Sequence, residues 1–283
     1  MSDRYGISIG RILHPTDFSN GSEVAFTHAL RLCCATNGSL AILHVDPEKK
    51  HPDWDKYPSV RETLSRWQLL PQQASRSDVA HLGIQITKSS VIDDNPANGI
   101  LHYLDQHPAD LLVLATHQRH GLDRWLQKTI AGRINNETDG ATLFIPYGHS
   151  GFVDQQTGEC RLKKILLPVD RDPDPSPAVE VTADLIRALS PGPCQVRLLH
   201  VGDSAGQPAI GLPNEDKAKW KWMNRVGSAV TAIREVAEQE AVDLIVMTTS
   251  GRHGFFDALR GSTTEQVVEH ARCPVLAVHA WSD

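Results

Sequence analysis

The feature that most constrains the fold of this chain is an internal duplication. Four motifs occur once in each half and in the same order: ILHPTD at 12–17 and ILLPVD at 165–170, LHV at 43–45 and 199–201, DLLVL at 110–114 and DLIVM at 243–247, and the apolar runs 143–146 and 275–278. Motifs that recur in order are the signature of a repeated structural unit. The sequence therefore predicts two copies of one domain, at residues 1–148 and 163–283, with a linker at 149–162.

Within each copy, short apolar runs alternate with longer stretches of helical pattern. The run 244–247 is uninterrupted and contains β-branched residues, as in a strand that is buried on both faces of a parallel sheet. Between such runs lie predicted helices, for example one that is capped by Ser19 or Asn20 and ends at Gly38. This alternation implies parallel strands and right-handed crossovers. The predicted fold class is α/β, with two tandem, doubly wound, Rossmann-like parallel sheets of about five strands each.

The second copy is shorter than the first between its second and fourth strands. In the first copy, that interval holds a helical stretch at about residues 59–80, a strand at 84–91 and a helix opened by Asn95-Pro96. In the second copy, the Gly- and Pro-rich segment 202–214 replaces the helical stretch. We therefore expect the second copy to lack one helix, and the adjoining sheet face to be covered by the other copy or by another subunit.

Two tryptophans lie beside this gap. Trp220 and Trp222 alternate as they would in a strand. They either form the expected contact surface or pack within their own domain.

The last strands of the two copies are apolar enough to pair with each other. Residues 143–145 and 275–278 are the segments expected to do so. Such intramolecular pairing would relate the two domains by a pseudo-twofold axis. Whether two chains also form a homodimer stays open.

The composition argues against several classes of protein, including nucleic-acid-binding and membrane-spanning proteins. The chain has 283 residues and a net charge of −6, and no basic stripe that would favour a nucleic-acid partner. No apolar run approaches the ~20 residues that a membrane span needs, and the N-terminus lacks the apolar core of a secretory signal. The five cysteines include no CxxC pair, so they indicate neither zinc ligands nor a disulfide framework. The expected location is cytoplasmic.

The carboxyl ends of the strands carry the candidate binding residues. Parallel α/β sheets bind ligands beyond these ends. In the second copy, Asp170, Val201 and Thr248 lie just past strand ends, and the first copy has Asp17, Val45 and Ala115 at the matching places.

A glycine-rich loop follows the fourth strand of the second copy. Gly261 allows close approach to the backbone, and Ser262 or Thr263 is a plausible N-cap of the next helix. Free N–H groups at such a helix start attract phosphate. An ordinary turn followed by a capped helix, without any phosphate ligand, would show the same sequence pattern.

These residues resemble the universal stress protein family in its tandem form, over nearly the whole chain. The resemblance implies a fold of the adenine nucleotide alpha hydrolase type. Nucleotide-binding members of the family carry Gly-x2-Gly-x9-Gly-Ser/Thr after the fourth strand. The second copy has, at these places, Thr248, Gly251, Gly261 and Ser262. The first copy has, at the same places, Ala115, Gln118, Lys128 and Thr129, which implies a degenerate site.

The resemblance implies a binding site for ATP, with or without Mg²⁺, in the second copy. Asp170 resembles the family's ribose-binding acid, and Val201 the residue whose backbone reads adenine. The full set of implied nucleotide-binding residues is Pro168, Val169, Asp170, Val201, Met247, Thr248, Gly251, Arg252, Gly261, Ser262 and Thr263. Alternatively, Asp170 is the N-cap of the following helix and Arg252 is a solvated surface residue.

Three histidines of the first copy raise a competing hypothesis. His14, His44 and His117 lie at the ends of neighbouring predicted strands and could together hold a transition metal. No helical HxxxH pair or cysteine supports this site. The recurrence of His44 as His200 favours a structural role instead.

No sequence motif identifies a catalytic centre. The chain has no Walker A lysine, GxSxG elbow, HExxH helix or GxGxxG fingerprint. We therefore predict a nucleotide-binding protein with a regulatory or stress-response role, for which slow ATP hydrolysis is conceivable. The alternative from another class is an interaction scaffold that binds no nucleotide.

Overall fold

The computed structural model describes residues 9–47, 54–116, 140–249 and 263–280. Its strands are β1 (Arg11–Thr16), β2 (Ser39–Asp46), β3 (Gln85–Ile92), β4 (Leu111–Thr116), β5 (Ala141–Pro146), β6 (Lys164–Pro168), β7 (Cys194–Val201), β8 (Ala218–Arg225), β9 (Leu244–Thr249) and β10 (Val275–His279). Its α-helices are α1 (Asn20–Thr36), α2 (Val60–Arg66), α3 (Arg76–His81), α4 (Pro96–Gln106), α6 (Ser176–Leu189), α7 (Ala229–Glu240) and α8 (Thr263–His270), with short 3-10 turns η1 (Trp54–Lys56) and η2 (Ser204–Gly206).

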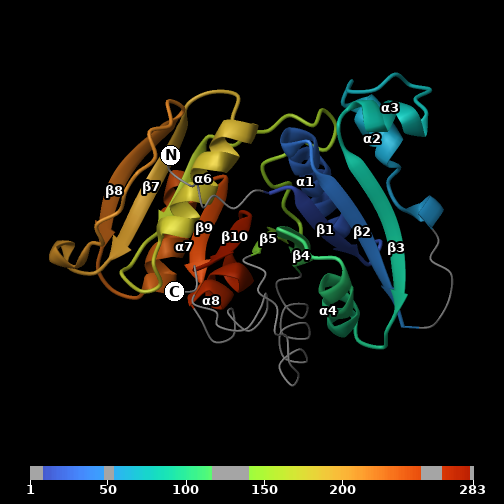
Figure 1. The fold of residues 1–283 in the computed structure, drawn as a ribbon. Helices are drawn as coiled ribbons and strands as arrows, with labels where there is room; N and C mark the ends of the chain where they lie inside the picture. Colours follow the sequence, from blue (N-terminus) through green and yellow to red (C-terminus); the bar gives the residue numbers. More distant parts are fainter. Residues whose placement is uncertain (1–8, 48–53, 117–139, 250–262, 281–283) are drawn as a thin grey trace, which may run out of the picture.

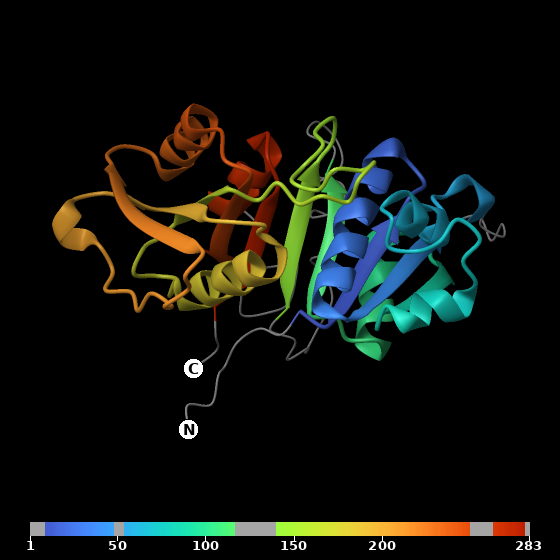
Figure 2. The same ribbon diagram turned by 90° about the horizontal axis from the view of Figure 1, so that it is seen from above.

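The ten strands form one continuous sheet. Their order is β3-β2-β1-β4-β5-β10-β9-β6-β7-β8, so each half contributes five parallel strands and the two halves are mirror images in strand order. The halves meet where β5 and β10 pair antiparallel, with Val275 opposite Phe144 and Val278 opposite Ala141. The predicted fold class and the predicted pairing of the last strands are both confirmed. Figures 1 and 2 show this central junction, with β3 and β8 at the two outer edges.

Helices cover both faces of the sheet. On one face, α1, α2 and α6 contribute Phe26, Leu64 and Ile186 to a buried apolar cluster. On the other face, α4, α7 and α8 bury residues that include Ile100, Ile233, Val267 and Val268. Apolar residues at helical spacing explain this arrangement, since each helix can bury only one stripe of side chains.

The first helices of the two copies, α1 and α6, are capped differently at their N-termini. The hydroxyl of Ser19 accepts a hydrogen bond from Ser22 N at 3.2 Å, so Ser19 is the N-cap of α1, as predicted. At the other end, Asn37 takes a left-handed conformation (φ 50°), so α1 ends there and not at the expected Gly38. In α6, Asp174 serves the helix start, since its Oδ1 accepts from Ser176 N at 3.1 Å.

One aspartate in each copy locks the start of the first strand. Asp110 Oδ2 accepts hydrogen bonds from Gly10 N at 3.0 Å and from Arg11 N at 2.7 Å. Asp243 Oδ2 accepts from Lys163 N at 2.7 Å and from Lys164 N at 2.8 Å. The aspartates of the repeated DLLVL and DLIVM motifs are therefore equivalent in structure as well as in sequence.

The interval between the second and fourth strands differs from the expectation in the first copy and agrees with it in the second. The predicted helix at 59–80 is two short helices, α2 and α3, because Gln68 has a positive φ of 60° and Pro71 follows it. In the second copy, η2 and an extended loop stand where these helices would be, which confirms the predicted loss.

The outer edge of the second copy corrects another expectation. β8 lies at the end of the sheet farthest from the first copy, so the first copy does not cover this region. Trp220 and Ile210 each pack against the core of their own domain. Trp222 remains 40% exposed.

The segment between the copies is well packed. His28 of α1 accepts, through Nε2, hydrogen bonds from Phe152 N at 3.0 Å and from Val153 N at 3.2 Å. Both Phe152 and Val153 are buried. The predicted linker therefore packs against α1 and is hydrogen-bonded to it.

None of the helices in the described ranges combines the length and the apolar composition that a bilayer crossing requires.

Candidate functional site

A cavity of about 430 Å³ opens at the carboxyl ends of β6, β7 and β9. It is lined by Pro168, Val169, Asp170, Asp172, Pro173, Pro175, Leu199, Val201, Ala229, Ile233, Met247, Thr248, Thr249, Thr263 and Thr264. Seven predicted site residues are among them: Pro168, Val169, Asp170, Val201, Met247, Thr248 and Thr263. The other four, Gly251, Arg252, Gly261 and Ser262, lie outside the described residues.

The end of β6 brings Asp170 to the mouth of this cavity. Val169 continues past the strand, and its N–H donates to Leu199 O at 2.8 Å. On its other side, Val169 O lies 3.3 Å from Nδ1 of His200, whose Nε2 lies 3.1 Å from Asp203 O. The backbone just before Asp170 is therefore held from both its N–H and its carbonyl.

Asp170 is an exposed carboxylate that caps no helix. Its Oδ1 accepts a hydrogen bond from Arg171 N at 2.8 Å. α6 begins only at Ser176, so the alternative interpretation of Asp170 as a helix N-cap is wrong. Within the described parts of the chain, the second carboxylate oxygen has no hydrogen-bond partner, and it can accept one from a ligand hydroxyl.

Apolar side chains form one wall of the cavity. Leu199, Ile233 and Met247 are buried and Val201 is partly buried. Such a surface suits a flat, largely apolar ring system. Thr248 also lines the cavity, and its buried Oγ1 has no hydrogen-bond partner among the described residues.

Two helices direct their N-termini toward the cavity. α8 begins at Thr263, and Thr263 and Thr264 both line the wall. α7 begins at Ala229, and the side chain of its N-cap residue, Ser228, makes no capping hydrogen bond. The first N–H groups of a helix lack partners within the helix and carry partial positive charge, so these two helix starts favour an anionic group in the cavity.

The equivalent region of the first copy is built differently. Asp17 Oδ1 accepts from Ser19 N beside the start of α1 at 3.0 Å, whereas Asp170 Oδ1 accepts from Arg171 N, well before α6 begins. Val45 packs closely against α4: a Cβ placed on Gly99 would lie 2.7 Å from Val45 Cγ1. Ala115 is partly buried at the end of β4, and Gln118, Lys128 and Thr129 lie outside the described residues.

Two of the three candidate metal-binding histidines, His14 and His44, act as structural residues. His14 is fully buried, with Nδ1 2.9 Å from Val113 O and Nε2 3.3 Å from Ser22 Oγ. Burial lowers the pKa of His14 to about 4. With both ring nitrogens engaged, His14 offers no free metal ligand.

His44 is held in a similar way. Its Nδ1 donates to Thr16 O at 2.9 Å and its ring stacks on Phe18. His117 lies outside the described residues, and no group of three metal-ligating side chains occurs in the ranges that the structure covers.

One wall of the cavity was not anticipated from the sequence. Asp172, Pro173 and Pro175 follow Asp170 and line the cavity, as does Thr264. The signal that could have revealed this wall is the segment RDPDPSP at 171–177, whose prolines prevent α6 from starting directly after β6.

Comparison with known proteins assigns the chain to a family. The sequence pattern of the Universal stress protein family matches residues 8–141 and 212–279. Universal stress protein MJ0531 of Methanocaldococcus jannaschii is 29% identical over 150 residues, which cover 44% of this chain and 85% of that protein.

The fold is also found in solved structures. A universal stress protein from Archaeoglobus fulgidus DSM 4304 is similar with a TM-score of 0.60 at 16% identity, over 95% of this chain and 98% of that one. A protein from Pseudomonas aeruginosa UCBPP-PA14 has a TM-score of 0.58 at 13% identity, over 96% and 94% of the two chains. At these identities the likeness concerns the fold alone.

Proposed function

The chain belongs to the universal stress protein family, and from this premise we propose that its C-terminal half binds an adenine nucleotide, with ATP as the expected ligand. We further propose a regulatory or stress-response role rather than dedicated catalysis. The observation that carries the proposal is the cavity of about 430 Å³ beyond β6, β7 and β9, into which Asp170 and two helix N-termini converge.

The lining of the cavity supports a division of roles. The apolar wall that includes Leu199, Val201 and Met247 accommodates the base. Asp170 accepts hydrogen bonds from the ribose hydroxyls, because one of its oxygens is available. The N-terminus of α8 attracts the phosphates.

Further groups of the proposed site come from the sequence motif. Gly251, Gly261 and Ser262 would form the phosphate cradle, and Arg252 would add positive charge. The carboxylates of Asp170 and Asp172 both line the cavity and are chemically suited to Mg²⁺, which prefers oxygen ligands. A bound Mg²⁺ would neutralise part of the phosphate charge beside these acids.

The N-terminal half is proposed to be a degenerate copy that contributes structure rather than a second nucleotide site. The close packing of Gly99 on Val45 and the departure of Ala115, Gln118, Lys128 and Thr129 from the family motif support this. The proposed domain boundaries are those given above, with residues 149–162 between the two copies.

A second candidate function is an interaction scaffold without nucleotide. Thr248 stands where the family motif has its first glycine, and its side chain occupies part of the cavity wall. A ligand-free protein that retains the fold would fit this reading.

Binding measurements on a matched pair of variants test the two candidates. Isothermal titration with ATP, ADP and AMP is performed on the unmodified chain, on Asp170→Asn and on Asp17→Asn. Loss of the charged acceptor in Asp170→Asn is expected to weaken binding by about tenfold or more, since a hydrogen bond to a charged group contributes ~1.5–3 kcal/mol. Asp17→Asn should bind as the unmodified chain does.

Two further variants and an extraction complete this test. Gly261→Val should abolish binding because its side chain would collide with the phosphates, while the thermal unfolding temperature stays nearly unchanged. Mass spectrometry of small molecules extracted from the purified protein identifies any nucleotide that it carries. Absence of binding by the folded, unmodified chain would favour the scaffold.

A further inference from the structure

The outer edge of β8 ends the ten-stranded sheet without a neighbouring strand. β8 pairs in parallel with β7 along its whole length, from Cys194 opposite Ala218 to Val201 opposite Arg225. In the described part of the chain, no strand lies on its other side. Figure 1 shows β8 at the periphery of the C-terminal half. An open strand edge is a ready template for another extended chain.

The direction of the backbone groups identifies which residues would pair. Lys217 O accepts from Cys194 N at 2.7 Å, and Arg225 O accepts from Gly202 N at 2.8 Å, so both of these positions face β7. The backbone groups of a parallel strand alternate between its two neighbours. Trp220 and Trp222 therefore direct their N–H and C=O groups toward the open edge.

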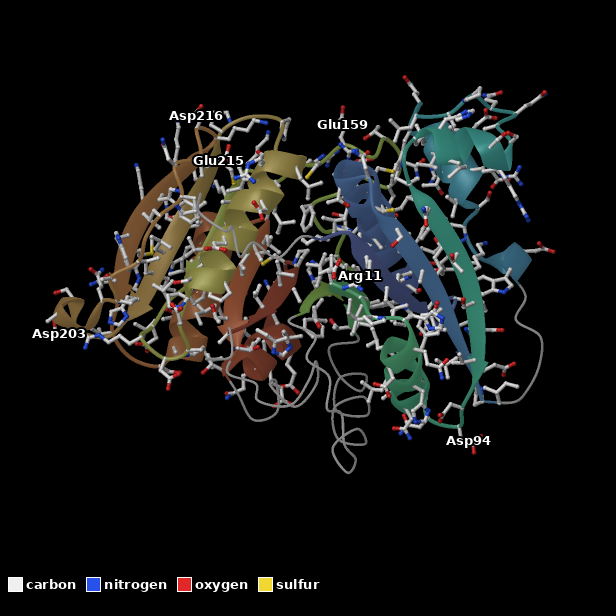
Figure 3. All side chains as sticks on the ribbon, viewed as in Figure 1. Arg11, Asp94, Glu159, Asp203, Glu215 and Asp216 are labelled. Carbon is white, nitrogen blue, oxygen red and sulfur yellow. The ribbon has the colours of Figure 1, made fainter. Side chains whose placement is uncertain are left out.

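The two faces of β8 differ in chemistry. Trp220 and Trp222 lie on the face that packs toward the α6 side, and Trp222 is 40% exposed. Lys219 and Lys221 lie on the opposite face, and both are exposed. From Lys217 to Arg225 the sequence has no acidic residue. The acidic residue nearest to this stretch is Asp216, which directly precedes it and is labelled in Figure 3.

The missing helix leaves the aromatic face accessible. In the first copy, α2 packs against the corresponding side of the sheet through Val60 and Leu64. In the second copy, the loop after η2 supplies Ile210, which, like Trp220, packs against the core cluster. Trp222 is not covered to the same extent, and its ring offers apolar area to a partner.

From these observations we propose that β8 is a docking edge for an extended segment of another protein in which acidic and apolar residues alternate. In a pair of strands, the side chains of neighbouring residues point to the same face. The acidic residues of the segment would lie beside Lys219 and Lys221. Its apolar residues would lie beside Trp220 and Trp222, with main-chain hydrogen bonds supplying the affinity.

The lysines argue against a second copy of this chain as the occupant. If β8 paired with β8 of another molecule within one continuous sheet, the two lysine-bearing faces would coincide. Lys219 and Lys221 would then lie opposite lysines, and like charges directly opposite are destabilising. The same charges favour an acidic segment, so charge complementarity selects the partner class.

Two synthetic peptides provide the probe. One has the length of β8, 8 residues, with glutamate and valine in alternation, and the other has lysine in place of each glutamate. Fluorescence anisotropy measures their binding to the full-length chain. The glutamate peptide should bind and the lysine peptide should not. Amide hydrogen exchange should show protection at Trp220 and Trp222 when the glutamate peptide is present.

Reversing the charge of the two lysines of β8, with a matched control elsewhere, tests whether they select an acidic partner. The double substitution Lys219→Glu and Lys221→Glu should weaken binding of the glutamate peptide by about tenfold and allow the lysine peptide to bind. Arg66→Glu with Arg76→Glu, on exposed positions of α2 and α3, changes the net charge equally and should leave binding unchanged. Trp222→Thr, which keeps a strand-forming residue, should also weaken binding.

Three results would overturn the proposal. These are equal binding of both peptides, equal loss in the two double variants, and protection that does not include Trp220 and Trp222. Association of the unliganded chain through β8 at high concentration would likewise show that the occupant is a second copy. Nucleotide titration of the β8 variants should match the unmodified chain, so this proposal can fail independently of the proposed function.

Discussion

In each half of the chain, the histidine of the repeated LHV motif, His44 or His200, places its Nδ1 against the carbonyl at the end of the first strand. Nδ1 of His44 is 2.9 Å from Thr16 O, and Nδ1 of His200 is 3.3 Å from Val169 O. Each carbonyl belongs to the residue just before Asp17 or Asp170. The repeated LHV motif therefore holds the end of the first strand, and with it the aspartate, in each copy.

Removal of His200 should weaken nucleotide binding although the ring is not assigned a ligand contact. In His200→Ala the carbonyl of Val169 loses its donor, and Asp170 loses part of its support. A typical hydrogen bond contributes ~0.5–1.5 kcal/mol, so we expect up to about a tenfold loss of ATP affinity. Calorimetric titration measures this loss.

The matched variant is His44→Ala. It removes the equivalent hydrogen bond in the copy that is proposed not to bind nucleotide. It should lower the thermal unfolding temperature and leave ATP affinity unchanged. If His44→Ala weakened ATP binding as much as His200→Ala, the proposed difference between the halves would be wrong.

Asp243 should contribute substantially to stability. Its Oδ2 accepts two backbone hydrogen bonds, from Lys163 N and Lys164 N. Asp243→Ala leaves both donors without this acceptor, which should lower the free energy of unfolding by about 2–3 kcal/mol. Urea titration measures the change. Glu235→Ala, which removes an exposed carboxylate from α7, is the control and should change stability by less than about 0.5 kcal/mol.

His28 should make the stability of the protein sensitive to acid. The buried ring donates from Nδ1 to Val24 O and accepts at Nε2 from Phe152 N and Val153 N. Burial lowers the pKa of His28 to about 4, whereas the pKa of an unfolded histidine is about 6.5. The unfolded state therefore binds the proton more readily than the folded state.

The sign of the pH effect follows from this difference in pKa. The stabilisation is fully present above about pH 6.5 and is lost as the pH falls from 6.5 toward 4, by about 3 kcal/mol for His28. Chemical denaturation at several pH values measures this slope. His14, whose pKa is also lowered to about 4, adds a similar effect. His28→Gln should therefore reduce the slope without abolishing it, and an unchanged slope would contradict the assigned role.

Much of the fold could be predicted because the duplication supplied each strand twice. Residues 244–247 and 110–114 share the pattern of a strand that is buried on both faces of a parallel sheet, and their recurrence in both halves strengthened that assignment. The same comparison of the two halves located Asp170 and Val201 at strand ends. The pairing of β5 with β10 was expected from their apolar character together with the family resemblance, and the structure adds that the two strands are antiparallel.

Other features depend on tertiary contacts that no local pattern encodes. The break between α2 and α3 is set by the positive φ of Gln68, a residue without the preference of glycine for that region. The burial of His14 depends on partners contributed by β4 and α1. By contrast, the wall formed by Asp172, Pro173 and Pro175 had a local signal, the prolines at 171–177, which delay the start of α6.

The central claim is that the two halves differ in their capacity for nucleotide, and native mass spectrometry tests it most directly. The intact chain, incubated with excess ATP, should carry one nucleotide, and Asp170→Asn should lose it while Asp17→Asn retains it. Two nucleotides on each chain, or one that persists in Asp170→Asn and disappears in Asp17→Asn, would contradict the account.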